Sequence, residues 1–116
     1  WGRRRYVPEV AAAQSDYELY EAAKVAVNMF PQGTAADIIK LAAVRVGQEL
    51  DHQGLSTPTT GLLAVVHDEL LIEIPADRLT SEWKCGIMSL MVSAGEGLPI
   101  ALGVEVEVGL NWGEME

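Results

Sequence analysis

A polar triplet, His67-Asp68-Glu69, lies between two apolar runs and carries the side chains best suited to chemistry in this chain. The runs 62–66 and 70–74 are each of strand length and rich in Val, Leu and Ile. We therefore expect both to be largely buried strands of a β-hairpin, with the triplet at its tip. A carboxylate on a rigid tip can bind a hard cation such as Mg²⁺, which needs only one or two protein carboxylates beside substrate phosphates. Asp68 is therefore a candidate metal ligand.

Spacing alone leaves several roles open for the triplet. Neighbouring strand residues point to opposite faces, so Asp68 and Glu69 are not expected to grip one ion together unless the turn relaxes that geometry. Aspartate is also favoured in turns because its side chain bonds to nearby backbone. His67 could be a general base, a contact to phosphate, or a residue at the sheet edge whose hydrogen bonds are satisfied and which has no further role.

The charge balance is acidic, with 8 Lys and Arg against 17 Asp and Glu, a net charge of −9. Such a balance counts against a nucleic-acid partner, because phosphate binding relies on clustered cations. Arg3, Arg4 and Arg5 form a small basic cluster that could contact phosphates or be a solvated arm. The chain opens on Trp1 rather than Met, which suggests an internal piece of a longer protein. The one cysteine, Cys85, is expected to be a buried thiol in a reducing, intracellular setting.

Two helices are expected before the hairpin. Ser15 and Glu18 have the spacing of a capping box, which predicts a helix over 15–30. The break 31–33 contains Pro31, whose ring excludes a hydrogen bond of the preceding turn. Thr34 to Asp37 repeats the capping pattern and predicts a second helix, which Gly54 closes.

A third helix and a last strand are expected after the hairpin. The helix follows the turn 75–77, and the segment 104–108 alternates between Val and Glu as a strand does. The predicted fold class is α+β: a small antiparallel sheet, made of the central β-hairpin plus the C-terminal strand, with helices packed on one face. We expect residues 1–116 to form a single partial domain, without a membrane span or a secretory signal. The expected buried stripe of the third helix is Leu79, Trp83, Ile87, Leu90 and Ala94.

Four stretches stand out in chain order: Gly2 to Pro8, Asn28 to Asp37, Val66 to Leu70 and Val104 to Gly109. Together they resemble the carboxy-terminal part of family A DNA polymerases, the bacterial DNA polymerase I group. Their order and spacing agree with that family, and the resemblance covers nearly the whole chain. It implies a carboxy-terminal palm region with an adjoining portion of the fingers.

The resemblance also implies roles for residues around the hairpin tip. Asp68 would be a catalytic aspartate that, with a second aspartate from an earlier motif, binds the two Mg²⁺ ions of nucleotidyl transfer. Glu69 would be its acidic neighbour with a supporting role, and His67 would approach the primer strand near its terminus. Val65 departs from the family, because bacterial enzymes commonly carry Gln there.

Further contacts to DNA are implied for the first helical region. Gln32 and Asn28 match positions that contact template and primer near the insertion site, and Lys24 stands where many members have Arg. The implied partners are primer–template DNA, a deoxynucleoside triphosphate and the remaining polymerase subdomains upstream. The implied location is the cytoplasm, in bacterial or viral replication or repair.

The chain shows no candidate for the first catalytic aspartate motif or for the fingers helix that holds the nucleotide, so this fragment is expected to be inactive alone. An alternative is a non-catalytic acidic interaction module in which the hairpin is structural. A free-standing metal-dependent phosphohydrolase would need a second ligand set that the sequence does not offer.

Overall fold

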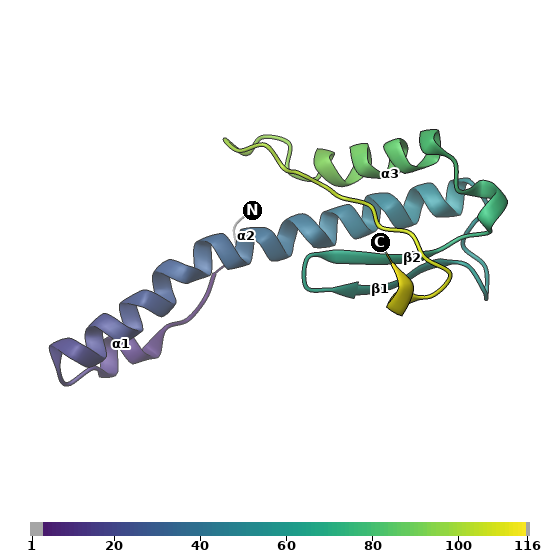
Figure 1. Cartoon of the computed structure of the whole chain (residues 1–116). Coiled ribbons are helices and arrows are strands. Elements are labelled where there is room, and N and C mark those ends of the chain that lie inside the picture. The colour runs from purple at the N-terminus through teal and green to yellow at the C-terminus, as the bar shows by residue number, and fades with distance from the viewer. Residues whose placement is uncertain (1–3, 116) are drawn as a thin grey trace. The chain divides into compact units, whose positions relative to one another are not determined.

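The computed structural model describes residues 4–115, so Arg3 of the predicted basic cluster lies outside the described residues. Contacts within the chain divide it between Asp37 and Ile38 into two compact units, which are described in turn. The helices and strands agree with the predicted α+β class. In chain order they are α1 (Pro8–Ala12), α2 (Asp16–His52), β1 (Gly61–Val66), β2 (Glu69–Glu73) and α3 (Ser81–Ser93), with short 3₁₀ turns at Ala76–Arg78 and Trp112–Glu114 (Figure 1).

The first unit contains α1 and the beginning of α2. The predicted cap at Ser15 is confirmed, because the Glu18 backbone N–H donates to the Ser15 hydroxyl at 3.2 Å. The Glu18 carboxylate in return accepts from the Gln14 backbone N–H at 2.7 Å, one residue earlier than an ordinary capping box. The first bond satisfies a backbone N–H that the first helical turn leaves unpaired, and the second fixes the chain just before the cap.

The predicted break at Pro31 is wrong, because Pro31 lies inside α2 and the helix continues from Asp16 to His52. Thr34 to Asp37 is therefore helix interior and not a second start. A proline within a helix removes one hydrogen bond and costs about 3 kcal/mol. Alanines, the best helix formers, lie on both sides of it and offset that cost: Ala22, Ala23, Ala26, Ala35, Ala36, Ala42 and Ala43.

In the second unit, α2 ends as the sequence predicts. Gly54 has a φ of 67°, a left-handed conformation that glycine adopts without steric cost. The Leu55 N–H donates to the Leu50 carbonyl at 2.8 Å and the Gly54 N–H to the Asp51 carbonyl at 3.0 Å. This pair of bonds is a Schellman motif, and Leu50 and Leu55 complete it by packing together in the core.

The predicted hairpin is confirmed as a two-stranded antiparallel sheet, with Val66 paired to Glu69 next to the turn. Its ladder shifts register between Leu62 and Ala64. The expectation that both strands are largely buried is wrong for β1, because Leu63 is 54% and Val65 46% exposed. Successive strand residues point to opposite faces, and the helices of this unit cover one face only.

The hydrophobic core of this unit joins α2, α3 and the hairpin. Figure 1 shows the C-terminal part of α2 running between α3 and the two strands. Trp83, in the first turn of α3, donates its Nε1 hydrogen to Gln53 Oε1 at 3.0 Å. The buried centre consists of Val46, Leu50, Leu55 and Ile87, and Leu62, Leu70, Ile72, Ile74, Trp83, Leu90 and Met91 pack against it.

The apolar stripe predicted for α3 is largely correct. Ile87 and Ala94 are buried, while Trp83 and Leu90 pack against the core. Leu79 is half-buried but precedes the helix, which begins at Ser81 after the Thr80 cap. The prediction of a buried Cys85 thiol is wrong, since its side chain is exposed. Cys85 is two residues from Ile87, about 200° around the helix, and therefore faces away from the core.

The predicted strand over 104–108 is also wrong, because none of these residues has a strand conformation. A strand needs the free edge of another strand for its backbone hydrogen bonds, and alternation between apolar and acidic residues does not supply one. No helix within residues 4–115 is both long enough and apolar enough to cross a bilayer.

Candidate functional site

The hairpin tip places His67, Asp68 and Glu69 together. His67 and Asp68 form the two-residue loop, and Glu69 begins β2 opposite Val66. His67 has a φ of 55°, the one positive value at a residue other than glycine among the described residues. Two-residue hairpin loops need such a backbone because their twist must match that of the strands. Glycine and asparagine usually fill this position, so histidine is here at a steric cost.

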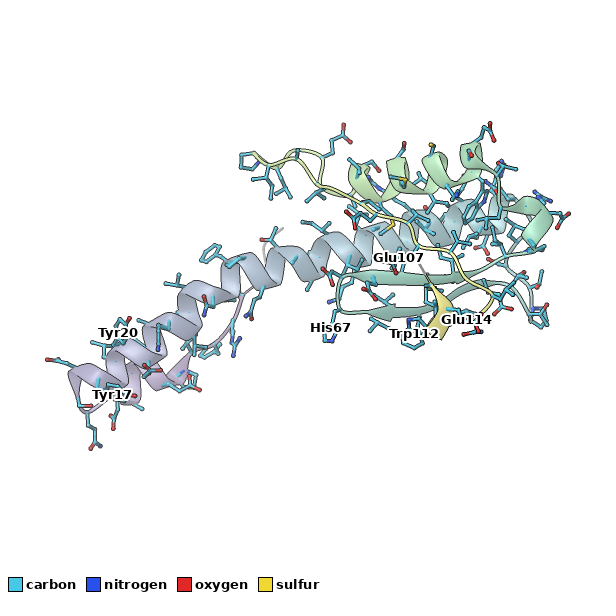
Figure 2. The ribbon with its side chains drawn as sticks, viewed as in Figure 1. Tyr17, Tyr20, His67, Glu107, Trp112 and Glu114 are labelled. Carbon is cyan, nitrogen blue, oxygen red and sulfur yellow. The ribbon has the colours of Figure 1, made fainter. Side chains whose placement is uncertain are left out.

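The Asp68 side chain is exposed, and within residues 4–115 its carboxylate makes no hydrogen bond or ion pair. An aspartate whose only role is to stabilise the turn would be expected to accept hydrogen bonds from nearby backbone N–H groups. His67 and Glu69 are exposed as well, and Figure 2 shows His67 at the end of the hairpin. The tip therefore offers a hydrated carboxylate with free oxygen lone pairs beside an imidazole.

A complete metal site is not formed by the described residues, since no three His, Cys, Asp or Glu side chains in 4–115 converge. Mg²⁺ is usually held by one or two carboxylates, with waters and substrate phosphates completing six ligands. The free carboxylate of Asp68 could supply one ligand of such a site. The rest of the ligands would have to come from outside this hairpin.

The remaining predicted site residues lie in the first unit, on α2. Lys24, Asn28 and Gln32 are all exposed and follow one another at intervals of four residues. A four-residue step along an α-helix advances about 6 Å and rotates about 40°, so the three side chains share one face. This face and the hairpin tip belong to different units and are described separately.

The Lys24 ammonium has two neighbours on this face. It forms an ion pair with Glu21 Oε1 at 2.6 Å, and it lies 5.1 Å from the centroid of the Tyr20 ring. Both members of the ion pair are about half exposed, so water screens their attraction. The cation–ring contact adds a comparable small attraction. Part of the Lys24 charge is thus compensated by Glu21.

Sequence reasoning did not single out Tyr20, which precedes Lys24 by one helical turn and is 63% exposed. The signal that could have found it is its spacing, because it continues the four-residue intervals of Lys24, Asn28 and Gln32 towards the helix start. Figure 2 shows Tyr17 and Tyr20 projecting from this part of α2.

An open groove of about 730 Å³ lies along α3 and the loop that follows it. Glu96 is the one charged residue of its lining, which is otherwise mostly apolar. It lacks the convergent polar groups that a catalytic site requires. The hairpin tip and the α2 face therefore remain the candidate sites.

Comparison with known proteins matches residues 1–114 to the family described as DNA polymerase family A. A thermostable DNA polymerase I from Thermus filiformis is 43% identical over 97% of this chain and 12% of its own length. DNA polymerase I from Chloroflexus aurantiacus is 40% identical over 99% of the chain and 12% of its own length. The relative from Deinococcus radiodurans, also named DNA polymerase I, is 40% identical over 97% and 11%.

The chain thus spans about one eighth of the length of the curated relatives that it matches. No solved structure matches it significantly.

Proposed function

Because the chain belongs to DNA polymerase family A, we propose that it is a carboxy-terminal palm region with adjoining fingers residues, acting in template-directed DNA synthesis by the whole protein. The observation that carries this proposal is the free, exposed Asp68 carboxylate at the tip of a hairpin fixed to the core. An oxygen ligand on a rigid element can be presented to a metal at constant geometry. A surface carboxylate in a flexible loop could not.

Asp68 would share in holding Mg²⁺ with a second aspartate supplied by another part of the protein. The chemistry that bound ions would supply is activation of the primer hydroxyl and charge stabilisation of the leaving pyrophosphate. Glu69, next to Asp68 at the start of β2, adds negative charge that favours cation binding near the tip. The His67 imidazole can donate a hydrogen bond to a primer phosphate, a charge-assisted bond stronger than one between neutral groups.

The α2 face would contact the template and primer. Asn28 and Gln32 each offer an amide that both donates and accepts, which suits base edges and sugars in the minor groove. Lys24 would add a point charge towards phosphate, without the planar fork that an arginine provides. The substrates of the whole protein would be primer–template DNA and a deoxynucleoside triphosphate.

The test is primer extension by the full-length protein carrying Asp68→Asn, which keeps the size of the side chain and removes its charge. Loss of a metal ligand should remove several kcal/mol of transition-state stabilisation, so we expect extension to slow by a factor of about 100 or more. Glu73→Gln is the matched control, because Glu73 is an exposed carboxylate at the far end of β2. It should extend at the unsubstituted rate.

Normal extension by Asp68→Asn would refute the catalytic role. It would favour a non-catalytic interaction module, in which the hairpin tip has no part in turnover.

A further inference from the structure

Four side chains of α2 follow one another at four-residue intervals: Tyr20, Lys24, Asn28 and Gln32. Each is exposed, and the successive 40° rotations spread them over about 120° of the helix surface. Only the last three have a predicted role. Tyr20 extends the same row by one turn, about 6 Å along the helix axis.

The Tyr20 ring is available for a further contact. It is 63% exposed, and the Lys24 ammonium lies over the ring at 5.1 Å from its centroid. The Lys24 ammonium lies over one face of the ring, and the 63% exposure of Tyr20 leaves ring surface accessible to a planar ligand. No other aromatic ring or cation among residues 4–115 contacts Tyr20.

We propose that Tyr20 is a further DNA-binding residue, whose open ring face stacks on an unpaired base of the template strand. This inference rests on the proposed function, since it extends the row that would contact DNA. A base within a duplex has both faces covered by its neighbours, whereas an unpaired base offers a free face to an aromatic side chain. Stacking of this kind tolerates any sequence, as a polymerase requires, because every base has a π-face.

The charges on this face make a stacking contact more important. Glu21 pairs with Lys24 at 2.6 Å and lies within the same sector of the helix. The row therefore carries little net positive charge with which to hold phosphate. Affinity that comes from stacking depends little on salt, whereas each cation that meets a phosphate changes the salt dependence by releasing counterions.

The experiment measures binding of the full-length protein to a labelled primer–template with a single-stranded template overhang, by fluorescence anisotropy. Tyr20→Ala should weaken binding about 5- to 150-fold, the range that stacking on one base contributes. Tyr20→Phe should bind as the unsubstituted protein does, because it keeps the ring. Alanine is the better helix former, so α2 is retained.

Phe30→Ala is the matched control. Phe30 is 72% exposed on the same helix, but it lies about 80° from Tyr20 on the side away from Lys24. Truncating this ring should leave DNA affinity unchanged.

Two further readouts separate stacking from other roles. On a blunt duplex, Tyr20→Ala should bind as well as the unsubstituted protein. Across a salt series, Tyr20→Ala should lower affinity without changing the slope of log Kd against log salt. Lys24→Gln should reduce the steepness of that slope by at most about one, because Glu21 compensates part of the Lys24 charge.

Unchanged binding by Tyr20→Ala, an equal loss on blunt and overhanging DNA, or a changed salt slope would each overturn the assignment. If Asp68 is still required for extension in that case, the proposed function stands and only this inference fails. If the unsubstituted protein neither binds nor extends a primer–template, both fail together.

Discussion

Replacing His67 by glycine should stabilise the fold. The His67 backbone has a φ of 55°, and for a residue with a Cβ this left-handed conformation costs about 1–2 kcal/mol. Glycine removes that cost, but its greater conformational freedom in the unfolded chain destabilises the folded state by about 0.5–1 kcal/mol. We therefore expect His67→Gly to raise the free energy of unfolding by about 0.5–1 kcal/mol. The measurement is urea denaturation of the 116-residue chain, followed by tryptophan fluorescence.

Two other substitutions at the same position complete the stability test. His67→Val should lower the free energy of unfolding by at least about 1 kcal/mol, because a β-branched side chain is strongly disfavoured at positive φ. His67→Asn should change it little, since asparagine tolerates the left-handed region. If glycine destabilises the chain as much as valine does, the steric reasoning about this turn is wrong.

Activity should respond in the opposite direction to stability. His67→Gly keeps the hairpin but removes the imidazole that we propose to contact the primer, and a hydrogen bond to a charged group is worth about 1.5–3 kcal/mol. In the full-length protein, kcat/KM for primer extension should fall about 10- to 150-fold while the fold becomes more stable. An extension rate that rises with stability would contradict the proposed role of His67.

Two further predictions concern the structure that supports the tip. Leu50 is fully buried at the centre of the core, so Leu50→Ala should lower the free energy of unfolding by about 2–5 kcal/mol in urea denaturation. The pKa of Glu82 lies below its ordinary value because its carboxylate accepts hydrogen bonds from its own backbone N–H and from the Thr80 hydroxyl. The stabilisation by Glu82 should therefore be present above pH about 4.3 and be lost as pH falls through the lowered pKa. When the free energy of unfolding is measured against pH, the Glu82→Gln variant should not show this loss.

The features that the sequence predicted correctly are those determined by a few neighbouring residues. The Ser15 cap, the Gly54 helix end and the hairpin turn each depend on side chains within about one turn of the position concerned. Val46 and Leu50 are buried because they lie about one helical turn apart on the face of α2 that packs into the core.

The wrong predictions concern features that depend on distant residues or on competing local preferences. Pro31 taken alone predicts a break, but the helical preference of the alanines around it is stronger. The 104–108 segment has strand alternation but lacks a strand edge to pair with among the described residues. Cys85 is exposed on α3, because it lies about 200° from Ile87 and therefore off the predicted apolar stripe, and its residue type alone was a poor guide to burial.

For the candidate site, the residues remain a prediction from the sequence, and the structure adds their exposure. This exposure distinguishes a proposed role in catalysis from a role in stability. Asp68 is exposed and makes no hydrogen bond or ion pair within residues 4–115, so its charge remains hydrated and contributes little to folding. Leu50, by contrast, contributes to stability and touches no substrate in the proposed mechanism. Asp68→Asn should therefore slow extension about 100-fold or more without shifting the urea midpoint, whereas Leu50→Ala should shift the midpoint. A loss of stability in Asp68→Asn comparable to that of Leu50→Ala would show that this carboxylate is part of the fold rather than of the chemistry.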